Sequence, residues 1–201
     1  MTPGTSAARA LALLAGLALA APVAAEPEEA VVGGQAPGFS LRVLNPEAAG
    51  VNWLSLQSLA GLEREDDEAR VVLLSFFASW CGPCREELPL LVDLDTRYRS
   101  MGLRVVGVSI DREEDGIAAA RRLVADHRAA YPVLSDRFNL LARRYLGDQA
   151  PLPSAFLIGR DGTILSIERG YTRGASGFLR ARVEAALGVR RSASAATAKS
   201  P

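Results

Sequence analysis

Apolar residues fill VVLLSFF, residues 71–77, except at Ser75. A short apolar run rich in Val and Phe is typical of a central strand that is buried on both faces. LRVVGVSI, residues 103–110, has the same character and predicts a neighbouring strand. Between the two, apolar residues recur three and four positions apart from Pro83 to Met101. This spacing predicts a helix, which Pro89 is expected to kink.

Helical and extended patterns continue to alternate after residue 110. Asp111 and Glu114 resemble a helix start signal, so we expect a helix from there to about His127. The remaining predicted elements are a short extended segment at 131–134, a helix ending at Gly147, strands at 154–158 and 163–168 joined by a tight turn, and a closing helix through 179–187.

The order of these elements predicts an α/β fold. A strand–helix–strand unit with short connections predicts a parallel pair of strands. The hairpin at 154–168 adds antiparallel strands. We therefore expect one mixed central sheet flanked by helices, within a single domain at residues 37–188.

The two ends of the chain differ from this domain. Residues 1–25 combine Arg9, a short Leu/Ala run and small residues before Glu26, which is the layout of a cleaved secretory signal. The alternative is an uncleaved membrane anchor, for which the apolar run is short. Residues 26–36 are expected to form a flexible acidic lead-in, and residues 189–201 a disordered Ser/Ala-rich tail.

Composition narrows the function classes only slightly. Among the 201 residues, 23 Lys and Arg balance 23 Asp and Glu, so no basic surplus supports nucleic-acid binding. We expect a monomer without a bound cofactor. The predicted export matters more, because outside the cytosol a pair of thiols becomes oxidised unless electrons are supplied.

The chain has two cysteines, Cys81 and Cys84, separated by Gly82 and Pro83. A zinc site usually needs four Cys or His ligands, and the chain has two cysteines and a single histidine, His127. A zinc site is therefore disfavoured. A copper site that uses both thiolates and His127 is a further alternative. A structural disulfide across two residues closes too short a loop to stabilise the fold much.

A redox pair fits the local pattern better. Cys81 follows the predicted strand and precedes the predicted helix, where the helix dipole and free N–H groups favour a thiolate. Pro83 stands where a first-turn proline is tolerated. Cys81 would attack a disulfide of another protein, and the more buried Cys84 would resolve the mixed disulfide.

Five motifs appear in order along the chain: APGFSL (36–41), WCGPCREELP (80–89), GVSID (107–111), YPVLSD (131–136) and LPSAFLIGRDG (152–162). In this order they resemble the TlpA/ResA-type branch of thioredoxin-fold proteins, over about residues 33 to 188. The resemblance implies a thioredoxin fold with an N-terminal extension and a βα insertion of the TlpA/ResA type.

The resemblance also implies roles for further residues. Pro153 matches the family's cis-proline, and Leu152 before it would present backbone groups to a bound partner. Glu87 matches the acidic residue of the family's CxxCxxE pattern, which manages the cysteines' protons, whereas Glu86 is expected to face water. Trp80, Gly82 and Pro83 would shape the site. One departure is Ser75, which stands where cytosolic thioredoxins have a buried aspartate.

The activity that the resemblance implies is thiol–disulfide exchange in the periplasm or another extracytoplasmic compartment. The Gly82–Pro83 dipeptide favours the reducing direction. Such proteins commonly take electrons from a membrane thiol transporter, and their clients include apocytochrome c and copper-site assembly proteins. An oxidase or isomerase, or a copper-binding metallochaperone, are the alternatives. Peroxidase activity is disfavoured because LSFFASWC lacks the Pro and Thr of a peroxiredoxin motif.

Overall fold

The computed structural model describes residues 30–61, 65–149, 151–171 and 175–189. The predicted signal segment lies outside these residues, as does the predicted tail except for Val189. None of the helices in the described ranges is long and apolar enough to cross a lipid bilayer.

A five-stranded mixed sheet organises the described part of the chain, with strand order β5-β4-β3-β6-β7. The central strand β3 (Val71–Phe77) pairs in parallel with β4 (Leu103–Ser109) and antiparallel with β6 (Ser154–Gly159). The edge strands are β5 (Val133–Ser135), parallel to β4, and β7 (Ile164–Arg169), antiparallel to β6. The predicted mixed sheet is therefore confirmed.

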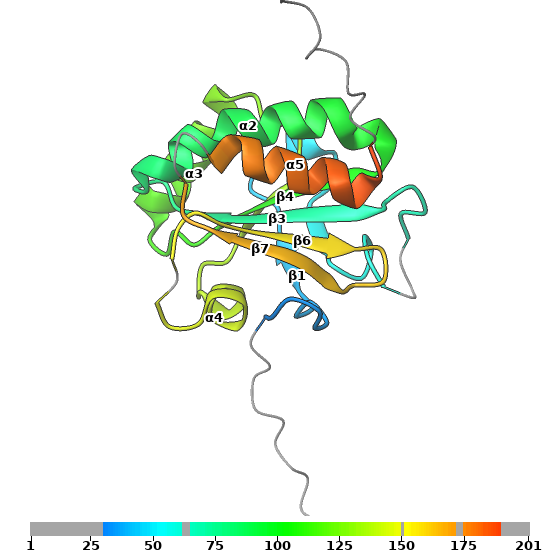
Figure 1. Ribbon diagram of the computed structural model, residues 1–201. Coiled ribbons are helices and arrows are strands. Elements are labelled where there is room, and N and C mark those ends of the chain that lie inside the picture. Colours follow the sequence, from blue (N-terminus) through cyan, green and yellow to red (C-terminus); the bar gives the residue numbers. More distant parts are fainter. Residues whose placement is uncertain (1–29, 62–64, 150, 172–174, 190–201) are drawn as a thin grey trace, which may run out of the picture.

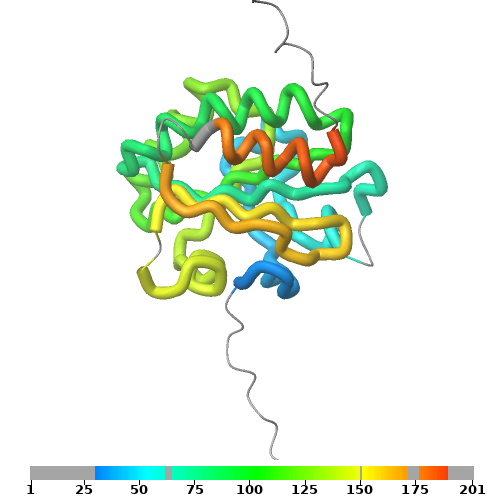
Figure 2. The backbone as a smooth tube through the Cα atoms, in the orientation of Figure 1, coloured from blue at the N-terminus to red at the C-terminus, as the bar shows by residue number. Residues whose placement is uncertain are grey.

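Helices cover both faces of this sheet. Helix α2 (Gly82–Tyr98), extended by a 3₁₀ turn at Arg99–Met101, lies beside α5 (Ala175–Leu187) on one face (Figures 1 and 2). Helix α3 (Glu114–Asp126) connects β4 to β5. Helix α4 (Leu140–Leu146) lies on the opposite side of the sheet from α2 and α5 (Figure 1). This arrangement is the predicted thioredoxin-like layering.

An N-terminal hairpin was not predicted from the hydrophobic pattern. Strands β1 (Ser40–Arg42) and β2 (Trp53–Ser55) pair antiparallel and flank the short helix α1 (Pro46–Ala49). A bridge between Val43 and Leu134 joins this hairpin to β5. It corresponds to the N-terminal extension that the resemblance implied. Strands of three residues are too short to show a period-2 pattern in the sequence.

Residues 30–36, the described part of the predicted lead-in, make backbone hydrogen bonds to the domain. The N–H groups of Gly33 and Ala36 donate to the carbonyls of Ile164 and Gly162, each at 2.9 Å. Ala30 is buried and donates to the carbonyl of Arg144. These backbone bonds attach the segment to the domain. At the other end, the N–H of Val189 bonds to Glu184, so the fold extends one residue into the predicted tail.

The hydrophobic core lies on both faces of β3, whose seven residues are all buried. Below it, Phe76, Tyr145 and Phe156 form an aromatic cluster with ring centroids 5.0–5.8 Å apart. The Tyr145 hydroxyl donates to the carbonyl of Pro37 at 2.8 Å, which satisfies the one polar atom of this cluster. This packing holds β3 rigidly, and the end of β3 leads directly to the two cysteines.

Helix α3 begins later than the sequence predicted. Its N-cap is Glu113 and its first residue is Glu114, so Asp111 lies outside the helix. The capping prediction for Asp111 was wrong because its carboxylate bonds to residues of β4 and of the loop after β3 instead.

Candidate active site around Cys81 and Cys84

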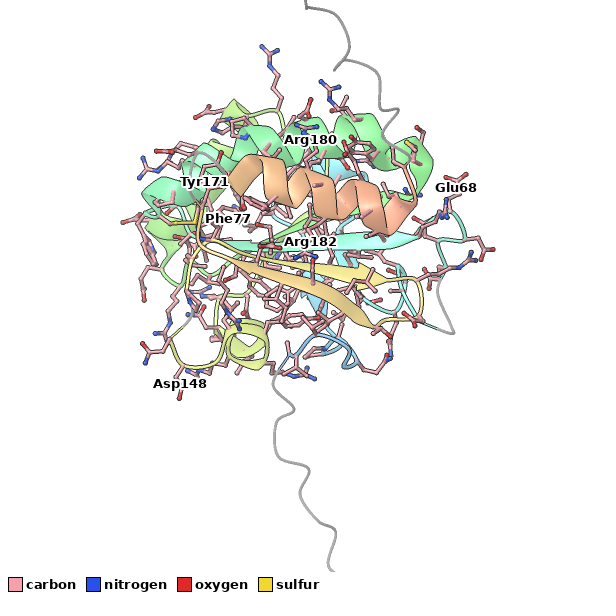
Figure 3. The ribbon with its side chains drawn as sticks, viewed as in Figure 1. Glu68, Phe77, Asp148, Tyr171, Arg180 and Arg182 are labelled. Carbon is pink, nitrogen blue, oxygen red and sulfur yellow. A yellow bond between two sulfur atoms is a disulfide. The ribbon has the colours of Figure 1, made fainter. Side chains whose placement is uncertain are left out.

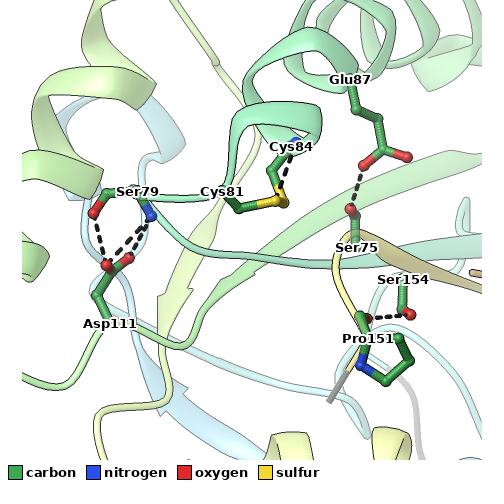
Figure 4. Close-up of a disulfide and its surroundings, with 8 residues drawn as sticks. All are labelled: Ser75, Ser79, Cys81, Cys84, Glu87, Asp111, Pro151 and Ser154. Atoms are coloured by element: carbon green, nitrogen blue, oxygen red, sulfur yellow. Dashed lines mark hydrogen bonds between the residues drawn. A yellow bond between two sulfur atoms is a disulfide. The ribbon is translucent and has the colours of Figure 1, made fainter. Parts of the chain in front are cut away.

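Cys81 and Cys84 lie where β3 ends and α2 begins, joined by a disulfide of 2.04 Å (Figure 4). Cys81 is the N-cap residue of α2, and Gly82 and Pro83 form its exposed first turn. Cys81 is 7% exposed and Cys84 1%. The site therefore has a more accessible outer sulfur and a buried inner one.

The start of α2 provides a hydrogen-bond donor to the outer sulfur. The Cys84 N–H donates to Cys81 Sγ at 3.2 Å. In the reduced protein, the same N–H and the positive end of the helix dipole would favour the thiolate of Cys81 over its thiol. Trp80, beside it, is largely exposed. The arrangement suits a nucleophilic thiolate that another protein can reach.

Glu87 lies one helical turn beyond Cys84 and is buried, with 5% of its surface exposed. The Ser75 hydroxyl donates to Glu87 Oε2 at 3.0 Å (Figure 4). Burial raises the pKa of Glu87 from 4.5 to about 7, and the hydrogen bond from Ser75 opposes that rise only in part. Glu86 next to it is exposed. Glu87 can therefore exchange a proton near neutral pH.

Ser75 stands in β3 where cytosolic thioredoxins have a buried aspartate, and here the carboxylate beneath the cysteines comes from Glu87 of α2 instead. Ser75 is fully buried in the middle of β3, where it pairs with Gly107 and Ala155. Its small side chain leaves room for the carboxylate that α2 supplies from above. Hydroxyl and carboxylate form a buried pair, which limits the number of unpaired polar atoms beneath the cysteines.

The loop before β6 forms the second wall of the site. The Leu152–Pro153 peptide bond is cis, as the family resemblance implied. The loop is held by the Ser154 hydroxyl, which donates to the carbonyl of Pro151 at 2.7 Å (Figure 4). The N–H of Gly170 also donates to the carbonyl of Pro153 at 2.7 Å. Within the described residues, the backbone of half-buried Leu152 makes no hydrogen bond.

A hollow of 350 Å³ separates this loop from α2 and α5. Its lining includes Pro83, Glu87 and Leu152, together with Tyr171 and Phe178. Figure 3 places Tyr171 at the same end of the sheet as Phe77, the last residue of β3. Exposed aromatic surface therefore lies beside the cysteines, and Glu87 forms part of the floor.

Asp111 is a site residue whose position the sequence did not predict. Its buried carboxylate accepts hydrogen bonds from the Ser79 N–H at 2.9 Å and from the Ser79 hydroxyl at 2.7 Å (Figure 4). It also accepts a hydrogen bond from the Ser109 hydroxyl at 2.8 Å. These bonds fix the loop that carries Trp80 and Cys81. The GVSID motif contains Asp111, but its spacing gives no indication that the carboxylate reaches back to β3.

Replacing Asp111 with alanine is expected to destabilise the protein by about 1–3 kcal/mol, because buried donors on Ser79 and Ser109 lose their acceptor. Asp111→Asn, which keeps one acceptor, should lose less. Urea unfolding would measure both, with Asp115→Ala on the exposed first turn of α3 as the control. An Asp111→Ala protein as stable as that control would contradict the assigned role.

His127, the remaining candidate ligand, lies at the C-terminal end of α3, whereas the cysteines lie at the N-terminal end of α2. Helices α2 and α3 both connect parallel strands, so they run in the same direction. The N-terminal end of α2 and the C-terminal end of α3 therefore lie at opposite ends of the strands. Within the described ranges, no three His, Cys, Asp or Glu side chains are close enough to hold a metal ion.

Comparisons with known proteins agree with this geometry. The thiol-disulfide oxidoreductase ResA of Oceanobacillus iheyensis is 28% identical over 139 residues, which are 69% of this chain and 65% of that protein, slightly under two thirds. The thioredoxin-like protein YneN of Bacillus subtilis is 30% identical over 138 residues, which are 69% of this chain and 71% of that protein.

Solved structures show the same fold. A putative thiol:disulfide interchange protein DsbE from Chlorobium tepidum has a TM-score of 0.67 and 29% identity, and the match covers 80% of this chain and 100% of that one. A model of the AhpC/TSA family matches residues 32–167, which is more than half of the chain. With the thioredoxin-like fold and this match, the chain belongs to the AhpC/TSA family.

Proposed function

We propose that this protein is a thiol–disulfide oxidoreductase of the ResA/DsbE type that reduces disulfides in partner proteins. The observation that carries the proposal is the pairing of an accessible Cys81 at a helix N-terminus with a buried Cys84, linked as a disulfide beside the Leu152–Pro153 loop. The names of the relatives, ResA and DsbE, support the same chemistry.

The reaction transfers two electrons in two exchange steps. The Cys81 thiolate attacks one sulfur of the client disulfide, forming a mixed disulfide and releasing the other client sulfur as a thiolate. Cys84 then loses its proton and attacks Cys81 Sγ, which expels the second client thiolate and leaves the Cys81–Cys84 disulfide. The client thiolates take up protons, and an external dithiol donor reduces the protein again.

Glu87 is proposed to accept the proton of Cys84 in the second step. Its pKa of about 7 lets it change protonation state near neutral pH, and it follows Cys84 by one helical turn. Ser75 acts as a positioning residue, because its hydroxyl bonds to the Glu87 carboxylate.

The surface around the cysteines is proposed to bind the client. Leu152 presents backbone groups without partners among the described residues, so an extended client segment could pair with them. Trp80, Tyr171 and Phe178 provide apolar contacts beside it. Trp80 and Pro83 would be the residues nearest a client bound at Cys81.

Direction and location complete the proposal. The Gly82–Pro83 dipeptide is the one found in reducing thioredoxins, which favours reduction of the client. Residues 1–25 are proposed to direct export to the periplasm or an equivalent compartment, where a membrane thiol transporter would supply electrons to a monomeric protein. Peroxidase chemistry is less favoured, because Leu74 and Ala78 stand where a PxxxTxxC peroxidatic motif would have proline and threonine.

A coupled reductase assay tests this function. The protein, a dithiol donor and a disulfide-bonded test protein are mixed, and the thiols released from the test protein are counted. Release is expected to be many times faster than with the dithiol alone, and Cys81→Ser should reduce it to that background. Faster oxidation of a reduced test protein than reduction of the oxidised one would instead support an oxidase. Stoichiometric copper binding without turnover would support a metallochaperone.

A further inference from the structure

A second groove of 440 Å³ lies away from the cysteines, between the β1–β2 hairpin, α3 and α4. It shares no lining residue with the hollow beside Glu87. Its walls are formed by apolar residues and arginines that come from four different segments of the chain. The lining residues that matter here are Arg42, Trp53, Arg121, Phe138, Leu140 and Arg144.

The apolar side chains of this groove are unusually exposed. Trp53 is 64% exposed and Phe138 70%, and Leu140 is similarly open to solvent. They belong to β2, to the loop after β5 and to α4, so no local sequence pattern would bring them together. Large apolar side chains that gather on the surface of a folded domain mark a binding site rather than scattered exposure. Tryptophan and phenylalanine are also enriched at protein interfaces.

The charged side chains of the groove are mostly arginines without acidic partners. Among the described residues, the side chains of Arg42 and Arg121 make no ion pair or hydrogen bond. Arg144 donates to the carbonyl of Gly38 at 2.8 Å, which leaves its charge uncompensated. Arg137 has only a long contact of 3.7 Å to exposed Glu114.

The acidic residues do not balance this charge. Besides Glu114, the lining contains Asp136, which is buried and accepts the N–H of Ala142 at 2.7 Å. Four arginines therefore face two carboxylates, one of which is already bonded to the backbone. Arginine pairs with carboxylates through two parallel hydrogen bonds, so the groove is complementary to an acidic ligand.

We propose that this groove docks an acidic segment of a partner protein in which carboxylates alternate with aromatic or aliphatic side chains. The carboxylates would pair with Arg42 and Arg121, and an apolar side chain would lie between Trp53 and Phe138. The groove adjoins the end of the sheet that carries the active site. Asp136, which lines the groove, follows β5, and its N–H donates to the carbonyl of Ser109, the last residue of β4. The identification of the partner as a client rests on the proposed function. The docking itself does not depend on it.

Trp53 provides a local reporter for the test. The chain has two tryptophans, so Trp80→Phe leaves Trp53 as the single one. The oxidised Trp80→Phe protein would be titrated with a peptide of about twelve residues in which Glu alternates with Phe and Leu. We expect a saturable change in Trp53 fluorescence that weakens as salt is added. A peptide with Gln in place of Glu should bind several times more weakly.

Two adjacent residues of α3 give a matched pair of variants in this background. Arg121 lines the groove, whereas Arg122 is exposed outside it. Arg121→Glu is expected to weaken peptide binding by about three- to tenfold, because repulsion replaces attraction. Arg122→Glu should leave the affinity within about twofold. Phe138→Ser should weaken binding by about tenfold, because the apolar contact is lost.

Other results would overturn the proposal. Equal effects of Arg121→Glu and Arg122→Glu would indicate a nonspecific response to net charge. A fluorescence change with octanoate but none with the peptide would indicate a small-carboxylate site. A change that depends on protein concentration alone would indicate a second copy of the chain as the occupant. Because the protein is oxidised and no exchange is measured, these outcomes do not depend on the proposed reductase activity.

Discussion

Replacing Cys84 with serine is expected to stop turnover and to leave client proteins covalently attached to Cys81. The 7% exposure of Cys81 and its position as the N-cap of α2 make it the sulfur that a client reaches. Cys84 is buried behind it, so its role is to break the mixed disulfide. Without it, turnover should fall by at least about a thousandfold.

Nonreducing electrophoresis after mixing the reduced variant with a disulfide-bonded client would measure the attached fraction. The band should disappear when a reductant is added. Cys81→Ser is the matched control, and it should neither turn over nor trap the client. If Cys81→Ser traps the client and Cys84→Ser does not, the order of attack is the reverse of the one proposed.

Replacing Glu87 with glutamine is expected to slow the second exchange step and to remove its pH dependence near neutrality. Burial raises the pKa of Glu87 to about 7, so above that pH the carboxylate can accept the proton of Cys84. Losing a general base typically costs about 10²–10⁴-fold in rate. The resolution rate would be measured by stopped flow between about pH 6 and 9, a range that spans the ionisation of both Glu87 and a thiol. It should rise through about pH 7 in the native protein, whereas in Glu87→Gln only the later rise from ionisation of the Cys84 thiol itself should remain.

Glu86 supplies the control for this measurement. It precedes Glu87 in the same helix but is exposed, so Glu86→Gln should leave the pH profile unchanged. Tyr131 is the buried titratable group whose pKa Glu87 itself influences, but burial raises the Tyr131 pKa far above the range of the experiment. Unchanged resolution rates and an unchanged Cys84 titration in Glu87→Gln would contradict the role of Glu87.

The same raised pKa predicts how stability depends on pH. In the unfolded chain Glu87 has a pKa near 4.5, and in the fold about 7. Between these values the folded state holds the proton and the unfolded state does not, so the free energy of unfolding falls as pH rises through that window. A shift of this size corresponds to about 3 kcal/mol. Glu87→Gln should remove most of this decline, which urea unfolding at pH 5 and pH 8, about the two ends of the window, would measure.

The sequence predicted the sheet and the location of the cysteines because both rest on local patterns. The run at Val71–Phe77, apolar except for Ser75, is typical of a strand buried on both faces, and all seven residues are buried. The spacing of Cys81 and Cys84 after that strand placed them at the start of α2. The family resemblance, and not the spacing, indicated that Pro153 follows a cis bond.

What the sequence did not predict depends on contacts between distant segments. Asp111 resembled a helix cap, but its carboxylate bonds to Ser79, which is 32 residues away. The bond between Ser75 and Glu87 joins a strand to a helix, so a serine without charge acquires a carboxylate partner. The arginine-lined groove combines residues of β1, β2, α3 and α4, and its composition is not visible in any one segment.

The reduction potential of the Cys81–Cys84 pair decides whether the protein reduces or oxidises its clients. The oxidised and reduced protein would be equilibrated in graded dithiol/disulfide buffers, and the fraction of free thiol measured at each ratio. We expect a potential below about −230 mV, toward the thioredoxin end of the range, where the dithiol reduces client disulfides whose own potential is higher. A potential above about −150 mV would contradict it, because such a pair forms disulfides in its clients instead of reducing them.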